Sequence, residues 1–313
     1  MTAVEAPTPL GGMVICRPAP LLYETGGEQG FTFMSDLHVG ARNVNYGLIE
    51  HELAQAKKHG DRVFLNGDVL DMILCGDRKR FRPDCVHPRL AGRGDLADAA
   101  VDWAAEILGP YADIIDGVGV GNHEEAVLHH HSVDVTKALV RELRKRRKDK
   151  DHTVHYAGYC GFLDYRLRCR ADVKKKLPPR SQHGRRFVVF YHHGAGGSAP
   201  VTKGMIDFHR LGGWADADVL LLGHKHNRIA SHVQRVSCPQ DGSEPVVKDV
   251  RHVMAGSYFE TYRGQTQQSV ERHGRITNYA ADRGLAPQGQ GGARVVLTFG
   301  PSHNDPYRVR VVQ

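Results

Sequence analysis

The chain has 313 residues, of which 41% are hydrophobic and 25% are charged, so it has enough apolar material for a substantial core and is not generally disordered. Residues 1–30 lack a sustained apolar run, and the apolar runs elsewhere are only strand-sized, a pattern that excludes a secretory leader and a membrane span. The six cysteines are scattered and form no CxxC pair, which favours reduced thiols. We therefore expect a cytoplasmic protein with no membrane partner.

The expected elements begin after an irregular lead-in. Pro and Gly recur throughout residues 1–30 and disfavour regular structure there. We expect only one edge strand in this segment, at 13–16. From residue 31 onward, short apolar runs alternate with amphipathic helical stretches. Strands are expected at 31–34, 63–65, 114–120, 187–191 and 219–222, and helices at 45–58, 95–108 and along the face formed by Val135, Leu139 and Leu143.

The pattern changes after residue 223. Strands expected at 227–236, 246–255, 294–299 and 307–312 follow one another without intervening helices, which favours added antiparallel strands. The fold class is therefore α/β, a two-sheet mixed β sandwich flanked by helices. We divide the chain into a lead-in at 1–30, a main domain at 31–262 with a basic insertion at about 134–186, and a long loop plus C-terminal strands at 263–313. Within the insertion we expect a strand pair at 154–169.

Polar residues follow five of the expected strands, at the edge where parallel sheets build their sites. Taken singly, each has an ordinary structural explanation, because Asp68 and Asn122 could cap helices and any one histidine could be a core residue. Five accidents in succession would not align in this way. The combined set of carboxylates, one amide and several imidazoles is too large for one ion and suits two divalent ions bridged by a carboxylate. The residues are Asp36, His38, Asp68, Asp71, Asn122, His123, His192, His193, His224 and His226.

The ordered motifs Asp-x-His, Gly-Asp-x-x-Asp, Gly-Asn-His-Glu, a strand-terminal His and Gly-His-x-His resemble the calcineurin-like metallophosphoesterase superfamily over residues 31–262. The resemblance implies a four-layer αββα sandwich. It also implies a bridging Asp68, a contact between His123 and the phosphate, and an Asp71 that orients the His123 ring. The implied ligands are Asp36, His38 and His226 for one metal, and Asn122, His192 and His224 for the second.

Two positions in this comparison are distinctive. His192 and His193 are adjacent, and His192 is the predicted ligand because it is the first polar residue after the apolar run; His193 is the alternative. The segment Ala255-Gly256-Ser257 replaces the Asn-Pro-Gly-Ser strand often found in the family, so no functional role is assigned to it.

The expected activity is dinuclear, metal-dependent hydrolysis of a phosphate ester, with a diester as the expected substrate. Manganese is the expected metal, with iron or zinc as alternatives. A nuclease of the same superfamily is one alternative. Another is a non-catalytic scaffold or nucleic-acid-binding protein on this fold, although such a protein would be expected to have lost ligands and none is missing.

The formal charge of +7 is concentrated in the basic insertion, where residues 134–186 carry 17 Lys and Arg against 6 Asp and Glu. This segment directly follows Asn122 and His123. We therefore expect it near the mouth of the site, where it would attract a polyanion such as nucleic acid. The alternative is a purely structural role, in which the segment is a solvent-exposed helix end whose basic residues complement the helix dipole.

Overall fold

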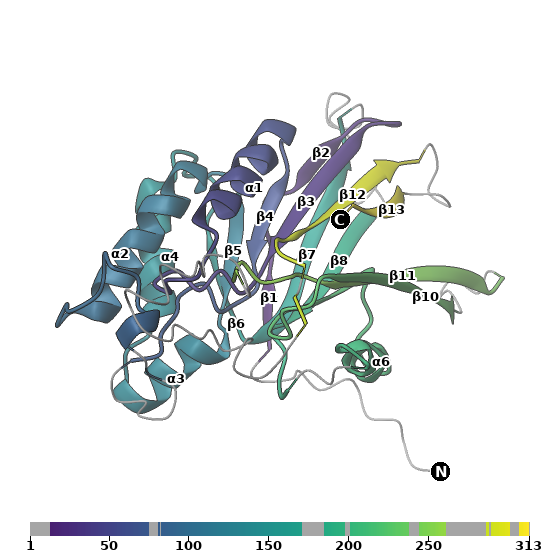
Figure 1. The fold of residues 1–313 in the computed structure, drawn as a ribbon. Helices are drawn as coiled ribbons and strands as arrows, with labels where there is room; N and C mark the ends of the chain where they lie inside the picture. The colour runs from purple at the N-terminus through teal and green to yellow at the C-terminus, as the bar shows by residue number, and fades with distance from the viewer. Residues whose placement is uncertain are drawn as a thin grey trace, which may run out of the picture.

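The computed structural model describes residues 13–74, 81, 83–170, 185–197, 201–237, 244–260, 286–287, 289–300 and 307–312. Two β-sheets pack face to face, and helices cover both outer faces (Figure 1). The expected two-sheet α/β sandwich with four αββα layers is therefore confirmed.

The first sheet has six strands in the described part of the chain, in the order β13-β12-β3-β4-β5-β6. Strands β3 to β6 are mutually parallel, while β12 runs antiparallel to β3 and to β13. The C-terminal strands β12 and β13 thus lie at one edge of this sheet. The bounds are β3 (Glu28–Met34), β4 (Arg62–Leu65), β5 (Ile115–Gly119), β6 (His155–Gly158), β12 (Ala293–Phe299) and β13 (Tyr307–Val312).

The second sheet has seven described strands in the order β1-β7-β8-β9-β11-β10, with β2 also pairing with β7. Strands β8, β9 and β11 are parallel, and β10 runs antiparallel to β11. The bounds are β1 (Val14–Cys16), β2 (Leu21–Tyr23), β7 (Cys160–Cys169), β8 (Arg185–His192), β9 (Val219–Leu222), β10 (Ile229–Ser237) and β11 (Val246–Met254).

Four helices cover the six-stranded sheet and one lies against the seven-stranded sheet in the described residues (Figure 1). Helix α1 begins where the Asn45 side chain accepts the amide of Leu48, and it ends at Gly60, whose φ of 69° suits a left-handed cap. The helices are α1 (Tyr46–His59), α2 (Leu96–Leu108), α3 (Asn122–His131), α4 (Val135–Arg146) and α6 (Met205–Gly212), with 3₁₀ turns η1 (Pro83–Cys85) and η2 (Gly109–Tyr111).

The lead-in at 1–30 is less irregular than expected. Besides β1, which matches the expected edge strand, it contributes β2 and the start of β3, and both β1 and β2 pair in parallel with β7. Proline cannot donate a backbone hydrogen bond to a neighbouring strand, but strands of three residues need few such bonds and therefore fit between the prolines. Residues 1–12 lie outside the described part.

The strand pair expected at 154–169 is also different in the structure. Strand β6 pairs with β5 in the six-stranded sheet, whereas β7 pairs with β8 in the other sheet, so the chain crosses between sheets at Tyr159. The remainder of the basic insertion at 171–184 and most of the expected loop at 264–292 lie outside the described residues. The division into three segments stays a prediction. None of the described helices combines the length and apolar character that crossing a membrane requires.

Candidate metal centre

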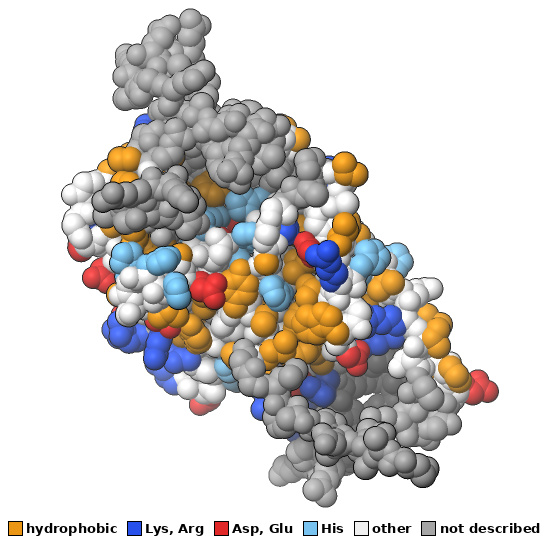
Figure 2. All heavy atoms as spheres, turned by 90° about the horizontal axis from the view of Figure 1, so that it is seen from below, with side chains coloured by type: hydrophobic (Ala, Val, Ile, Leu, Met, Phe, Trp, Pro, Cys, Tyr) orange, Lys and Arg blue, Asp and Glu red, His pale blue; other side chains and the backbone are white. Residues whose placement is uncertain are grey.

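The predicted site residues come from both sheets. In the six-stranded sheet, the neighbouring parallel strands β3, β4 and β5 lead into the loops that carry Asp36 and His38, Asp68 and Asp71, and Asn122 and His123. In the other sheet, β8 and β9 lead into His193 and into His224 with His226. Histidine side chains are visible at the centre of the face in Figure 2. The site thus lies at one end of the sandwich, where the two sets of strands end together.

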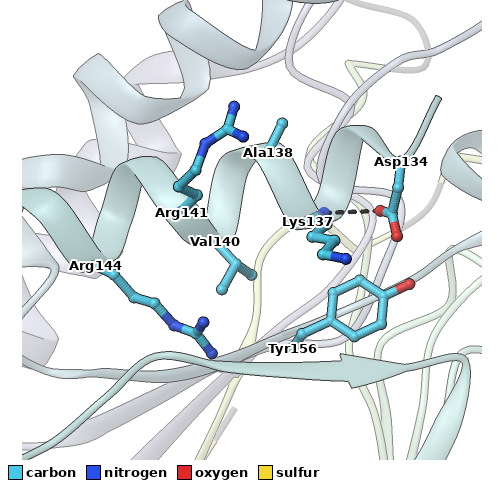
Figure 3. A pocket seen from close by; sticks show the side chains of 7 residues that line it. All are labelled: Asp134, Lys137, Ala138, Val140, Arg141, Arg144 and Tyr156. Atoms are coloured by element: carbon cyan, nitrogen blue, oxygen red, sulfur yellow. Dashed lines mark hydrogen bonds between the residues drawn. The ribbon is translucent and has the colours of Figure 1, made fainter.

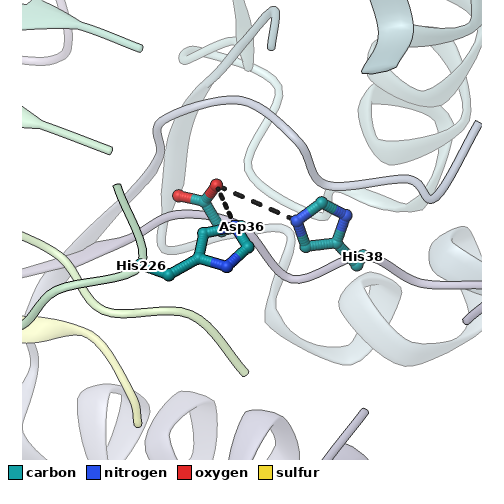
Figure 4. A group of neighbouring side chains, drawn as sticks. All are labelled: Asp36, His38 and His226. Atoms are coloured by element: carbon teal, nitrogen blue, oxygen red, sulfur yellow. Dashed lines mark ion pairs between the residues drawn. The ribbon is translucent and has the colours of Figure 1, made fainter. Parts of the chain in front are cut away.

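One cluster consists of Asp36, His38 and His226, whose ligand atoms all lie within 4.8 Å of one another (Figure 4). Asp36 Oδ1 is 3.2 Å from His226 Nε2 and 3.9 Å from His38 Nε2. Asp36 and His38 are fully buried, and His226 is partly exposed. This is the set that the sequence predicted for one metal.

A second cluster consists of Asp68, His193 and His224. His193 Nε2 lies 3.3 Å from Asp68 Oδ2 and 3.2 Å from Asn122 Oδ1, which brings the predicted amide ligand to the same place. Asp68 Oδ2 also lies 3.9 Å from His38 Nε2. One carboxylate therefore faces donors from both clusters, which is the position expected of a bridging ligand.

The preference for His192 has to be corrected, because His193 is the histidine in the cluster. His193 is fully buried, and its Nδ1 contacts Asn66 O at 2.8 Å while its Nε2 faces Asp68. The His192 ring points elsewhere, and its Nδ1 accepts the amide of Gly194 at 2.9 Å. Adjacent strand residues point to opposite faces, so only one of the pair can reach Asp68.

Asp71 lies between two imidazoles. Its Oδ1 is 3.0 Å from His123 Nδ1, the predicted partner, and 3.5 Å from His38 Nδ1, which sequence analysis did not pair with it. A carboxylate on one ring nitrogen fixes the tautomer and turns the other nitrogen outward. His123 Nε2 accordingly lies 3.9 Å from Asp68 Oδ2, and His38, Asp68 and His123 form a third cluster.

The backbone is strained at the predicted ligands. Seven non-glycine residues in the described chain have positive φ, and five of them are predicted metal ligands. Such conformations cost on the order of 1–3 kcal/mol each and persist only where the surroundings enforce them, which is typical of functional sites. The five are Asp36 (φ 56°), His38 (49°), Asp68 (46°), His224 (65°) and His226 (55°).

Two glycines permit this close approach of the loops. Gly67 has φ of 82°, and a Cβ there would lie 2.6 Å from His193 Nδ1. A Cβ on Gly121 would lie 2.1 Å from Asp68 Oδ1. Any side chain at either position would displace the Asp68 carboxylate or the His193 ring, so both glycines are steric requirements of the site.

The carboxylates give the site a strong preference for positive charge. Burial opposes ionisation of Asp36, but contact with His226 and the charges of His226 and His193 outweigh it and lower its pKa to about 2. Burial also disfavours a charged imidazole, yet the Asp68 carboxylate raises the pKa of His193 to about 10 and, with Asp71, that of His123 to about 9. Without a cation the carboxylates therefore hold protons on these rings, and a metal ion bound by Asp68 and His193 would replace the proton on His193.

The donor set fits divalent cations. Within the described residues Asp36 Oδ1 and both ring nitrogens of His38 are buried without a well-directed hydrogen bond. Burial lowers the pKa of His38 and of His224, so both rings are neutral and offer lone pairs. Buried polar atoms left unpaired are costly, and a cation shared by carboxylate and imidazole would satisfy them.

Sequence analysis missed the role of Glu124. This buried carboxylate accepts the backbone amides of Asp68 (3.0 Å), Leu70 (2.9 Å) and Gly121 (2.8 Å). It thereby ties the Asp68 loop to the loop of Asn122 and His123. Burial, followed by the charge of Asp68, raises the pKa of Glu124 to about 7. The only indication in the sequence was that Glu124 directly follows His123. That position is ambiguous, because a carboxylate that merely caps a helix would also occur there.

The segment after β11 supports the first cluster, although no role was assigned to it. Ser257 Oγ donates to Asp36 O at 3.3 Å, and the amide of Tyr258 donates to the same oxygen at 3.2 Å. The Phe259 ring stacks on His38 with centroids 4.3 Å apart. Because β11 runs parallel to β9, its end is a sixth strand end at the same edge.

Lys225 anchors the loop that carries His224 and His226. Its buried ammonium group contacts the carbonyls of Ala195, Gly196 (3.0 Å) and Gly197 (2.9 Å), and it lies 3.4 Å from Asp207 on α6. The residue between the two histidines thus holds their loop against residues 195–197.

Replacing Lys225 with Met is therefore expected to weaken Mn²⁺ binding by about 10–100-fold, the usual effect of losing a group that orients ligands. Three carbonyls also lose a donor, so the urea unfolding midpoint should fall. Calorimetric titration with Mn²⁺ and urea unfolding measure the two effects. Lys248→Met, which removes a partly exposed lysine paired with Asp216 and Asp218, is the control. Unchanged Mn²⁺ affinity in Lys225→Met would contradict this role.

The densest part of the basic segment does not lie at the mouth of the site as expected. Arg147 is buried and donates to the carbonyls of Ala112 and Ile115, at the beginning of β5, whereas Asn122 follows the end of that strand. Residues 144–150 therefore lie toward the amino-terminal ends of the parallel strands, away from the end where the predicted site residues lie. Several have structural partners, including Arg144 on Val154 O and Lys145 with Glu142.

Comparisons with known proteins give structural neighbours only. No protein-family model and no curated protein sequence matches this chain. A conserved uncharacterised protein from Streptococcus pneumoniae TIGR4, described as a predicted phosphoesterase, aligns over 92% of this chain and 90% of its own at 14% identity and a TM-score of 0.31. A metallophosphoesterase from Sphaerobacter thermophilus aligns over 91% and 88% at 11% identity and a TM-score of 0.32.

Proposed function

We propose that the protein is a dinuclear, metal-dependent phosphoesterase with a preference for phosphodiesters. The observation that carries the proposal is the Asp68 carboxylate, buried between two clusters of carboxylate and imidazole donors. In this proposal Asp36, His38 and His226 hold one cation, Asn122, His193 and His224 hold the other, and Asp68 bridges them. Manganese is the proposed metal, with iron or zinc as alternatives, because all three accept mixed oxygen and nitrogen ligands.

Two divalent cations at such a site neutralise phosphate oxygens and activate water at neutral pH. The chain's own contribution is to position the substrate and handle the leaving group. His123 is the proposed acid: Asp71 holds its Nδ1 at 3.0 Å, and its Nε2 is directed toward the Asp68 side of the site. A protonated His123 stabilises charge that develops on the leaving oxygen and donates a proton to it. Asp71, which is not among the proposed ligands, is the carboxylate that would stay beside the His123 ring and favour its protonated form.

The test is hydrolysis of bis(p-nitrophenyl) phosphate by metal-stripped protein with and without added Mn²⁺, beside the monoester p-nitrophenyl phosphate. We expect turnover of the diester that requires Mn²⁺ and exceeds turnover of the monoester. Metal content is measured on the same samples. Two bound ions with no hydrolysis of either ester would favour the non-catalytic scaffold instead.

A further inference from the structure

A pocket of about 430 Å³ lies between helix α4 and the edge strand β6, apart from the metal centre (Figure 3). It is lined on the helix by basic and small side chains and on the strand by one aromatic ring. The lining residues are Asp134, Lys137, Ala138, Val140, Arg141, Arg144 and Tyr156.

The pocket has three cationic side chains and one acidic one, and of the cations Arg144 also donates to Val154 O at 2.8 Å. Lys137, Arg141 and Arg144 follow at helical spacings of four and three residues, so they share one side of α4 over about 10 Å. All three are exposed. Lys137 and Arg141 form no ion pair with another described residue, whereas the neighbouring Lys145 pairs with Glu142. The one acid, Asp134, caps the helix at the amide of Lys137 and also interacts with the Tyr156 hydroxyl.

Tyr156 supplies an aromatic surface to the pocket. Figure 3 shows its ring beside Lys137 and Asp134, between the helix and the strand. An aromatic ring next to a row of cations is the combination that holds single-stranded nucleic acid, because every base has a face that can stack while the cations neutralise phosphates. A volume of about 430 Å³ lies in the range of pockets that hold one small ligand, such as a nucleotide.

Strand β6 leads from the pocket toward the metal centre. Tyr156 is two residues, or about 7 Å of strand, before Gly158. The carbonyl of Gly158 accepts the amide of Val120, just before Asn122. The next residue, Tyr159, donates to Gly194 O at 2.7 Å, and its ring centroid lies 5.5 Å from that of His193. A nucleic-acid strand held in the pocket therefore has β6 as a direction along which to extend toward the proposed metals.

We propose that Lys137, Arg141, Arg144 and Tyr156 form a subsite for one nucleotide of single-stranded nucleic acid. The cations contact its phosphates and the Tyr156 ring stacks on its base. As a statement about substrate this rests on the proposed phosphoesterase function, and it makes the natural diester a nucleic-acid strand. Binding at the subsite needs neither metal ions nor turnover.

The test uses full-length, metal-stripped protein and a fluorescein-labelled 12-nucleotide oligothymidylate, followed by fluorescence anisotropy over a range of salt concentrations. Lys137→Gln/Arg141→Gln is expected to raise the Kd at least tenfold and to reduce the slope of log K against log salt by about 1.4, or 0.7 for each lost phosphate contact. Tyr156→Leu is expected to raise the Kd at least fivefold with an unchanged slope, since it removes stacking and no charge.

The matched control is Lys145→Gln/Lys148→Gln, which removes the same charge from exposed positions of the same segment outside the pocket. Equal weakening by both double variants would overturn the proposal in favour of general charge attraction. Thymidine monophosphate competing as tightly as the 12-mer, or a 12-base-pair duplex binding as tightly, would also overturn it. Since binding is measured without metal, a protein that binds the strand but hydrolyses no ester contradicts the proposed function and leaves the subsite standing.

Discussion

Asp68→Asn is expected to lower the Mn²⁺-dependent hydrolysis of bis(p-nitrophenyl) phosphate by about 10³-fold, because losing the bridging charge removes several kcal/mol of electrostatic stabilisation. An amide has almost the same shape as the carboxylate. Asn also tolerates the left-handed backbone of residue 68, whose φ is 46°, so the fold should survive. The measurements are kcat with saturating Mn²⁺ and the number of ions bound per chain.

The control for this variant is Asp216→Asn, which makes the same chemical change at a side chain that is 90% exposed and pairs only loosely with Lys248. It should retain full activity and both ions. If Asp68→Asn hydrolysed the diester at the rate of this control, the bridging role and the dinuclear site would both be wrong.

Replacing His193 and His192 separately is expected to give opposite results. His193→Asn removes a buried ring 3.3 Å from the bridging carboxylate, so affinity for the second ion should fall by more than about 100-fold. This exceeds the loss that is typical when a residue that only hydrogen-bonds to a ligand is replaced. His192→Asn leaves the cluster untouched, because that ring is occupied with the amide of Gly194. Calorimetric Mn²⁺ titration and metal content per chain separate the two variants.

One ion per chain in His193→Asn and two in His192→Asn is the expected outcome. The reverse pattern would restore His192 as the ligand. Both variants should be folded, which the circular dichroism spectrum checks, since His192 is half-buried and asparagine keeps polar atoms for the His193 partners Asn66 O and Asn122 Oδ1.

The sequence was sufficient to predict the strand ends but not which face each residue occupies. The amphipathic pattern predicted the bounds of α1 and α2 to within one residue, and the apolar runs predicted the two-sheet architecture and the strand ends that carry Asp, Asn and His. Helix α6 had no counterpart among the predicted elements. The error at His192 arose because both faces of β8 are apolar. Phe187, Val189 and Tyr191 pack between the sheets, while Phe190 packs toward α6. His193 continues the first set, and no alternation in the sequence reveals which set faces Asp68.

Other features depend on contacts between distant segments. Glu124 ties two loops together through backbone amides, and Lys225 caps carbonyls about thirty residues away, and neither partner has a side-chain signature. The basic helix end was misplaced for a related reason. Its sequence position after His123 is close to the site, but α4 runs back along β5, so Arg147 meets the beginning of that strand. The path of the chain therefore carries the basic helix end away from the site, although it is close to His123 in sequence.

The division of the proposed ligands between the two sheets links metal binding to the integrity of the sandwich. Asp36, His38, Asp68 and Asn122 belong to one sheet, and His193, His224 and His226 to the other. Cations held by both sets, as proposed, would bind only the closed molecule, so they would act as removable cross-links and would add about 2.7 kcal/mol of stability when their concentration is 100 times the Kd. Chelation would then loosen the contact between the sheets as well as abolish hydrolysis, and the midpoint of thermal unfolding would report the metal supply.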